Sequence, residues 1–190
     1  MIPRRPFYFL RHGQTNWNLE GRYQGVADTP LNETGLAQAQ AAAAKLASAK
    51  IDRIVASPLI RALKTAGIVA EATGAAIHID RGLRERDFGS FDGRVIGEVK
   101  AEHGLPTEKN SRSIMPSDAD PWDEIFTRVP PVIGRWLERY GADTILFVAH
   151  GGVFDAIHLH LVGPREGAES KHAWPYLVEP TVPGWAFREL

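Results

Sequence analysis

The chain has 190 residues, and the 44% that are hydrophobic are enough to bury one sizeable core. Its 22 basic and 23 acidic residues give a formal net charge of −1, which excludes the basic excess typical of nucleic-acid or anionic-membrane binding. There is no cysteine, so disulfides, thiolate nucleophiles and zinc–thiolate sites are excluded as well.

The first half of the chain alternates predicted strands and helices. A short continuous apolar run near the N-terminus predicts a strand buried on both faces, and alanine-rich periodicity predicts the first long helix. Asn32 or Thr34 can cap that helix, and Gly74 can close the next one. In chain order the expected elements are a strand at 7–10, a helix at about 33–48, a strand at 52–57, a helix at 59–73 and a strand at 75–79.

The second half continues the same alternation. Residues 105–121 are polar, contain prolines and have no clear period, so they predict a loop or insertion. The helical pattern of 122–141 contains Pro130 and Pro131, where we expect a break or a kink. The other expected elements are a weaker helix at 95–104, a strand at 144–149, a helix at 153–163 and an edge strand at 184–190.

Strands that alternate with helices predict an α/β fold, a three-layer α/β/α sandwich whose mostly parallel central sheet has helices on both faces. We expect a single domain over residues 1–190, with a lid or insertion at roughly 95–125. In such sheets ligands bind beyond the carboxyl ends of the strands. Three of these ends carry polar groups: Arg11 with His12, Ser57 leading to Arg61, and His150 with Gly151.

These strand ends predict an anion site. Two strands deliver a histidine followed by glycine, and the second leads directly into a helix whose N-terminus favours negative charge. Arg11 and Arg61 can reach the same point, and guanidinium groups match phosphate oxygens in pairs. Two arginines, His12, His150 and the helix N-terminus beginning at Gly151 are therefore typical of a cradle for a phosphoryl dianion.

The chemistry needs a nucleophile and an acid. No G-x-S-x-G elbow is present, whereas a neutral imidazole attacks at physiological pH, and nearby arginines disfavour its protonation. The leaving oxygen must then receive a proton. Glu85 and Asp87 lie in a glycine-rich stretch and are both candidates for this acid.

The ordered motifs resemble those of the histidine phosphatase superfamily, also called the phosphoglycerate-mutase-like family. The resemblance implies that His12 becomes phosphohistidine, that Arg11, Arg61 and His150 hold the phosphoryl oxygens, and that Glu85 is the proton donor and later the base. It also implies that Asn18 and Gln24 line the pocket and that neither a metal nor another cofactor is used. The motifs are "RHGQTNWN" from Arg11, then Gly21, Arg22 and Gln24, "SPLIRALKTA" from Ser57, "LRERDFGSFDG" from Leu83 and "VAHGG" from Val148.

Simpler interpretations stand beside these assignments. Asn18 and Gln24 could be cap or turn residues, and Glu85 could form a surface salt bridge, leaving Asp87 as the acid. The acidic stretch 118–124 could attract a hard cation, but it lacks the glycine and spacing of a calcium loop. Relative to the family pattern, Lys64 and the segment 91–93 are departures that concern the substrate pocket.

We expect a phosphomonoesterase, because the segment 109–124 lacks the tyrosine-bearing insertion with which the mutases of the family seal their site. A mutase and a non-enzymatic phospholigand-binding module remain the alternatives. The expected partner is a small phosphorylated metabolite, not nucleic acid or membrane, and a homo-oligomer stays open. Lys109 and Arg112 suggest a second anion on the substrate, whereas Ile114, Met115 and Trp122 suggest an apolar group.

The chain also has no targeting pattern that we recognise. The apolar run at 7–10 is shorter than the core of a secretory signal, although two arginines precede it. No run approaches the ~18 apolar residues of a membrane-spanning helix. We therefore expect a soluble, cytoplasmic protein.

Overall fold

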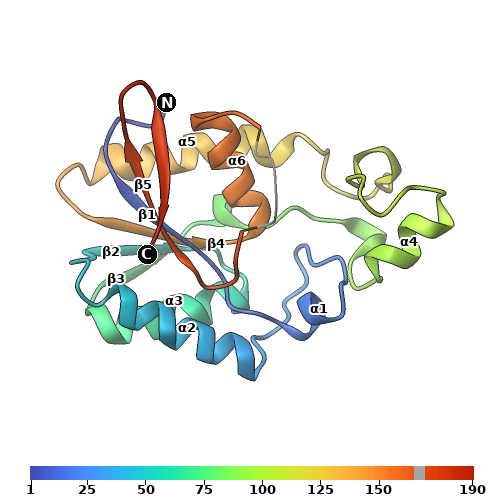
Figure 1. Ribbon diagram of the computed structural model, residues 1–190, viewed down its shortest axis with the longest axis horizontal. Helices are drawn as coiled ribbons and strands as arrows, with labels where there is room; N and C mark the ends of the chain where they lie inside the picture. Colours follow the sequence, from blue (N-terminus) through green and yellow to red (C-terminus); the bar gives the residue numbers. More distant parts are fainter. Residues whose placement is uncertain (165–169) are drawn as a thin grey trace.

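A computed structural model describes residues 1–164 and 170–190, and a six-stranded sheet lies at its centre (Figure 1). The strand order is β3-β2-β4-β1-β5-β6. The first four strands in that order are mutually parallel, whereas β5 runs antiparallel to β1, and β6 antiparallel to β5. Their bounds are β1 Phe7–Arg11, β2 Arg53–Ala56, β3 Ala76–Ile79, β4 Ile145–Ala149, β5 Pro175–Pro180 and β6 Trp185–Glu189.

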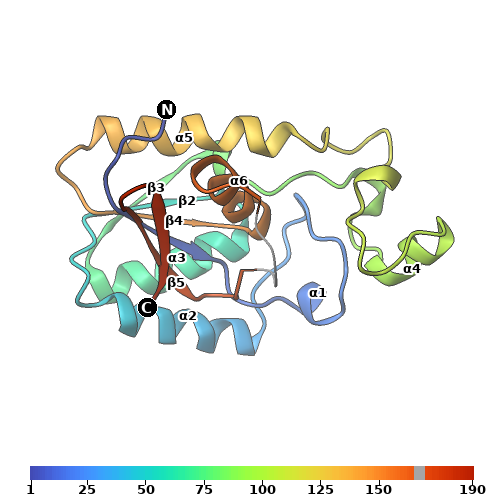
Figure 2. The same cartoon turned by 45° about the horizontal axis from the view of Figure 1, so that its top comes forward.

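Two pairs of helices cover the two faces of the sheet, which confirms the expected α/β sandwich (Figures 1 and 2). Helices α2 (Glu33–Leu46) and α3 (Ile60–Thr73) lie on one face, and α5 (Glu124–Arg139) and α6 (Gly151–Leu161) on the other. Successive residues of β4 alternate between the two cores: Leu146 packs toward α2 and α3, and Phe147 toward α5 and α6. A strand buried on both faces must be apolar at every position, as the sequence of β4 is.

Helix α5 runs unbroken through Pro130 and Pro131, so the expected break is wrong (Figure 2). The prolines remove two backbone donors, but the apolar face continues across them. Ile125 and Val129 precede the prolines, Ile133 and Leu137 follow them, and all four are fully buried against the sheet. Packing of this continuous face holds both halves of the helix in line despite the lost hydrogen bonds.

Strand β5 was not anticipated, whereas the expected edge strand is β6. The segment Pro175–Pro180 carries a proline at each end, which argues against a central strand. Both prolines nevertheless fit, because they occupy the terminal positions of the strand and its interior residues pair with β1 and β6. The C-terminal hairpin thus continues the parallel sheet with two antiparallel strands.

Residues 95–125 extend from the sheet beyond its carboxyl edge (Figures 1 and 2). They contain the short helix α4 (Ile96–Glu102) and a single 3₁₀ turn at Arg112–Ile114, where we expected only a loop after the helix. Val99 of this segment packs with Tyr23 and Phe91 in a small core that is separate from the two cores of the sheet. Another short helix, α1 (Asn16–Leu19), lies nearby and was also not expected.

Within the described ranges 1–164 and 170–190, none of the helices combines the length and apolar character that crossing a membrane requires. The longest of them, α5, has 16 residues and charged side chains along its outer face.

Candidate active site

The neighbouring carboxyl ends of β1, β4 and β2 bring the predicted polar groups together. His12 directly follows β1, and its backbone N–H donates to the carbonyl of Ala149 in β4 at 2.9 Å. His150 follows β4, and Ser57 follows β2. The two imidazole rings lie with centroids 5.2 Å apart. The sheet order therefore turns two remote sequence motifs into one site.

The His12 ring is fixed by contacts at both nitrogens. Nδ1 lies 2.7 Å from the carbonyl oxygen of Gly13. A carbonyl oxygen only accepts hydrogen bonds, so Nδ1 carries the proton. Nε2 then carries the lone pair, and Arg61 Nε donates to it at 3.3 Å. Burial, followed by the charges of Arg61 and Arg11, holds the pKa of His12 well below its ordinary value. The ring is thus neutral, with its basic nitrogen toward the arginine.

Arg61 is fully buried and is held by backbone carbonyls. Nη1 donates to Ala27 at 2.8 Å and Nη2 to Gly25 at 2.7 Å. Asp92 clamps the same segment from the other side by accepting from the N–H groups of Gly25, at 2.7 Å, and of Ala27, at 3.3 Å. Burial lowers the pKa of Arg61 to about 10, and it remains a cation at neutral pH. Asp92, a departure from the family pattern, therefore supports the loop that orients Arg61.

His150 and Arg11 complete the polar groups at these strand ends. The Nε2 atom of His150 lies 2.7 Å from the Ser57 hydroxyl, whereas its Nδ1 is buried without a hydrogen-bond partner among the described residues. Burial and the charge of Arg61 lower the pKa of His150 well below its ordinary value. Arg11 donates from Nη1 to the carbonyl of Ser170 at 2.7 Å. Gly151 lies directly beside this arginine, and an added Cβ would make an ordinary van der Waals contact with Arg11 Cζ at 3.5 Å.

Glu85 joins the site through the N-terminus of α6. Its Oε2 accepts from the backbone N–H of Gly152 at 3.0 Å, and its Oε1 accepts from the N–H of Arg86 at 2.9 Å. A Cβ on Gly152 would come within 2.4 Å of Glu85 Oε1, so the approach depends on glycine. Asp87, the alternative acid, instead accepts from Gly89 at 2.8 Å and does not line the cavity.

Asn18 and Gln24 have structural contacts and also face the cavity. Asn18 is the third residue of a capping box at the start of α1, where its Oδ1 accepts from the backbone N–H of Thr15 at 3.1 Å. Gln24 accepts from the Thr15 hydroxyl at 3.1 Å and donates to Thr29. The simpler interpretation as a cap residue is therefore correct for Asn18, whereas Gln24 bonds two threonine side chains and caps no helix; both residues also lie on the cavity wall.

A cavity of about 500 Å³ opens over these groups. Arg11, His12, Glu85 and Gly151 line it, whereas Arg61 and His150 are fully buried beside His12. The opposite walls come from α1, α4 and the segment 110–126. The lining also includes residues that the sequence analysis did not single out: Tyr23, Arg86, Phe88, Ile96, Lys100, Phe126, Asp155 and His172.

Two of these missed residues stand out by their position. The centroid of the His172 ring lies 5.8 Å from that of His12. His172 belongs to the irregular segment that precedes β5. No motif marks it, because its approach to His12 depends on the hairpin that we did not anticipate. Arg86 follows Glu85 in the quoted motif, but there it could be read only as half of a surface salt bridge.

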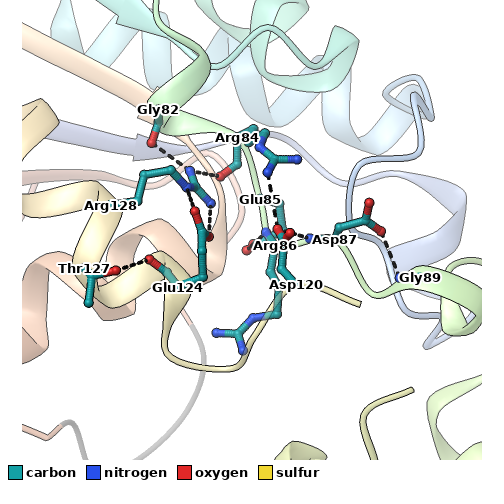
Figure 3. A network of polar contacts seen from close by, with 10 residues as sticks. All are labelled: Gly82, Arg84, Glu85, Arg86, Asp87, Gly89, Asp120, Glu124, Thr127 and Arg128. Carbon is teal, nitrogen blue, oxygen red and sulfur yellow. Dashed lines mark hydrogen bonds and ion pairs between the residues drawn. The ribbon is translucent and has the colours of Figure 1, made fainter. Parts of the chain in front are cut away.

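The acidic stretch 118–124 does not converge on one point, and Figure 3 shows two of its carboxylates, Asp120 and Glu124, bound to different arginines. Asp118 accepts from the backbone of Ser90, Asp120 pairs with Arg84, Asp123 with Arg112, and Glu124 with Arg128. Among the residues that the structure describes, no group of three or more metal-ligating side chains comes together. Arg112, a suggested second-anion residue, is thus part of an exposed ion pair.

Comparison with known proteins identifies the family. A sequence profile described as the histidine phosphatase superfamily (branch 1) matches residues 7–176. The chain therefore belongs to the histidine phosphatase superfamily. The expected enzyme class, a hydrolase of phosphoric monoesters, is confirmed at the level of this family.

The relatives have different names. The chain is 33% identical to phosphoglycerate mutase-like protein 4 of Arabidopsis thaliana, over 78% of this chain and 67% of that protein. It is 30% identical to glucosyl-3-phosphoglycerate phosphatase of Mycobacterium tuberculosis, over 98% of this chain and 91% of that protein. Its fold matches the crystal structure of the alpha-ribazole phosphatase from Shigella flexneri with a TM-score of 0.81 at 26% identity, covering 97% of this chain and 95% of that one.

Proposed function

We propose that this chain hydrolyses small phosphomonoesters through a phosphohistidine intermediate on His12. The observation that carries the proposal is the neutral His12 ring, with the lone pair of Nε2 beside Arg61 at 3.3 Å and His150 and Arg11 close by. Preorganised donors in a site that excludes water stabilise developing negative charge strongly. Such a group suits the transfer of a phosphoryl dianion to the imidazole.

In the first step the lone pair of His12 Nε2 attacks phosphorus. A P–N bond forms while the P–O bond to the alcohol breaks, and its electron pair leaves with the alcohol oxygen. The Gly13 carbonyl keeps Nδ1 protonated. The 3.3 Å hydrogen bond from Arg61 Nε to His12 Nε2 breaks when the lone pair of Nε2 bonds to phosphorus. A protonated Glu85 gives its proton to the leaving oxygen, so the product is a neutral alcohol.

In the second step water attacks phosphorus from the cavity. The Glu85 carboxylate takes the proton of the water, the P–N bond breaks, and its electron pair returns to Nε2. Arg11, Arg61 and His150 hold the phosphoryl oxygens through both steps, with the N-terminal N–H groups of α6 beside them. The two arginines supply the positive charge and the N–H groups add donors, so the proposal needs no metal or other cofactor.

We further propose that residues 1–190 act as one domain in which the segment at roughly 95–125 selects the alcohol part of the substrate. Ser111 and Trp122 of this segment line the same cavity as His12. The named relatives act on different phosphoesters, among them glucosyl-3-phosphoglycerate. A small phosphorylated metabolite is accordingly the substrate class that we propose, with Asn18 and Gln24 forming part of its pocket.

The test is release of inorganic phosphate from p-nitrophenyl phosphate by the wild type and by His12→Ala, both with EDTA present. Turnover that resists EDTA and disappears in His12→Ala supports the proposal, particularly if acid-labile phosphoenzyme can be trapped from the wild type alone. His160→Ala is a matched control, because that histidine lies at the far end of α6. Equal turnover by wild type and His12→Ala would refute the proposed nucleophile.

A mutase is the second candidate, because one relative is named as mutase-like. Both reactions share the phosphohistidine and differ in the acceptor of the phosphoryl group. Incubation with 3-phosphoglycerate separates them: a phosphatase releases phosphate, whereas a mutase forms 2-phosphoglycerate faster than it releases phosphate. The polar character of residues 109–124 favours access of water and therefore the phosphatase.

A further inference from the structure

Glu85 projects from a stretch of backbone without regular structure. Residues 84–88 belong to neither a helix nor a strand, and 3₁₀ turns at Arg81–Leu83 and Gly89–Phe91 flank them. From this stretch the Glu85 carboxylate accepts from the backbone N–H of Gly152 at 3.0 Å. No ladder of backbone hydrogen bonds fixes such a segment, so the position of the carboxylate depends on contacts from elsewhere in the fold.

Arg128 of helix α5 holds the backbone that precedes Glu85 (Figure 3). Its Nη1 donates to the carbonyl oxygens of Gly82, at 2.8 Å, and of Arg84, at 3.0 Å. Its Nε and Nη2 donate to the two carboxylate oxygens of Glu124, at 2.6 and 3.0 Å, one turn earlier in the helix. This bidentate pair fixes the plane of the guanidinium, which in turn fixes both carbonyl groups.

Helix α5 also packs directly against this stretch of backbone. A Cβ on Gly82 would lie only 2.4 Å from Val132 Cγ2, so the close approach depends on glycine. Leu83 is fully buried in the core that α5 shares with the sheet. Arg128 therefore reaches the carbonyl groups from a rigid neighbour.

Asp120 and Trp122 hold the backbone that follows Glu85. Asp120 Oδ2 accepts from the backbone N–H of Asp87 at 3.0 Å, and the N–H of Asp120 donates to the carbonyl of Asp87 at 3.0 Å. Between these contacts and Glu85, the Cζ atom of Arg86 lies 4.0 Å from the ring centroid of Trp122. The residues on both sides of Glu85 are thus held by the segment 120–128.

We infer that Arg128, fixed by Glu124, and Asp120 are positioning residues for the Glu85 carboxylate. The inference rests on the proposed function, in which Glu85 gives its proton to the leaving oxygen. It also gives a role to the acidic stretch 118–124, two of whose carboxylates hold the backbone of the acid. Misplacement of a reacting group by about 1 Å costs on the order of 10²-fold in rate, so loss of this hold should affect the proton transfer.

The first test measures how turnover depends on the leaving group. Phenyl phosphate and p-nitrophenyl phosphate have similar shapes, but the poorer leaving group of the phenyl ester depends far more on a proton. The ratio of their kcat/KM values, p-nitrophenyl over phenyl, reports the step in which the alcohol leaves, since hydrolysis of the phosphohistidine is common to both esters. We expect Arg128→Gln to raise this ratio by about 10–100-fold, toward the value of Glu85→Gln.

Further variants separate positioning from a general loss of structure. The ratio is internal to each variant, so a smaller folded fraction cancels. Arg128→Lys should raise the ratio less than Arg128→Gln, because an ammonium can replace some of the contacts but not all of them at once. Asp120→Ala alters only the backbone that follows Glu85 and should also raise the ratio by less. Arg139→Gln is the matched control and should keep the wild-type ratio, because it removes an exposed arginine from the far end of α5.

A double variant tests whether Arg128 acts through Glu85. Arg128→Gln added to Glu85→Gln should leave the ratio where Glu85→Gln alone places it, because both changes act on one proton transfer. A further increase in the double variant would overturn the inference. So would a wild-type ratio in Arg128→Gln when Glu85→Gln raises it.

The amide proton of Gly152 separates this inference from the proposed reaction. It is donated to Glu85 Oε2, so its NMR chemical shift reports the position of the carboxylate without any turnover. Arg128→Gln should move this resonance toward its position in Glu85→Gln, and Arg139→Gln should not. If Glu85→Gln left the ester ratio unchanged, the proposed acid would be refuted, while a moved Gly152 resonance would still support Arg128 as a positioning residue. An unmoved resonance in Arg128→Gln would overturn the inference.

Discussion

Replacement of Arg61 by lysine should damage catalysis and stability together. The guanidinium is fully buried and uses three of its five N–H groups internally, one each toward His12, Ala27 and Gly25. Two N–H groups remain for phosphoryl oxygens. The single nitrogen of a lysine ammonium cannot reach both carbonyls and the imidazole at once, because they are held by different parts of the fold.

The expected magnitudes follow from these contacts. Loss of one transition-state donor corresponds to a decrease of about 10²–10³-fold in kcat/KM. One or two buried carbonyls lose their partner, each at roughly 1–3 kcal/mol, so the free energy of unfolding should fall by about 2–4 kcal/mol. A shift of that size lowers Tm by roughly 5–15 °C in a chain of this length.

The assay combines turnover of p-nitrophenyl phosphate with urea unfolding of Arg61→Lys and of Lys64→Gln. Lys64 is exposed on the same helix, so its replacement controls for the loss of a cation from α3. We expect Lys64→Gln to stay within twofold of the wild type in turnover. Near-wild-type activity of Arg61→Lys would refute the role of the fork, and unchanged stability would refute its role in holding residues 25–27.

Three further predictions address the acid, the buried histidines and helix α5. Glu85→Gln should reduce turnover of alkyl phosphates by about 10²–10⁴-fold and turnover of p-nitrophenyl phosphate far less, because an activated leaving group needs no proton. Equal losses on both kinds of ester would count against Glu85 as the acid. Asp87→Asn is the control. The lowered pKa values of His12 and His150 mean that below pH 6.5 the unfolded chain binds protons that the native chain does not. As the pH is lowered below 6.5, the free energy of unfolding should therefore decrease by up to about 1.4 kcal/mol per pH unit for each histidine. A His12→Gln/His150→Asn variant should show a flatter dependence on pH in urea titrations. Pro131→Ala should raise the free energy of unfolding by about 1–2 kcal/mol, because it restores a backbone N–H donor on the exposed side of α5. The unfolded chain gains conformational freedom without the proline, and this cancels only part of the increase. A lower Tm would show that the proline stabilises the helix at this position.

The sequence predicted most of the elements, because their signals are local. The alternation of apolar runs with 3.6-residue periodicity identified β1 to β4 and the covering helices, and Gly74 closes α3 with φ of 74° as a left-handed cap should. The short helix α1 and the 3₁₀ turn at Arg112–Ile114 were missed because they are too short to show a period, and the other errors involve proline. Pro130 and Pro131 suggested a break in α5, and Pro175 and Pro180 concealed β5, yet tertiary packing tolerates all four.

For the site, the sequence identified which residues belong together but not all of their neighbours. Arg11, His12, Arg61, Glu85 and His150 stand in recognisable motifs, and parallel strand order alone suggests that the strand-borne ones meet. The contact of Asp92 with the segment that holds Arg61 lies outside any local pattern. It could not be derived, because it depends on two loops that approach only after the sheet has formed.

The sequence by itself therefore determined the α/β class, most of the strands and helices in chain order and the chemistry at the strand ends, since periodicity and residue type are properties of the chain. Only the tertiary structure decided that Nε2 of His12 faces Arg61, and that His172 approaches His12. It also decided the burial of Arg86 against Trp122, 36 positions further along the chain. Each of these depends on distances across the sheet and the segment 95–125, which no spacing along the chain specifies.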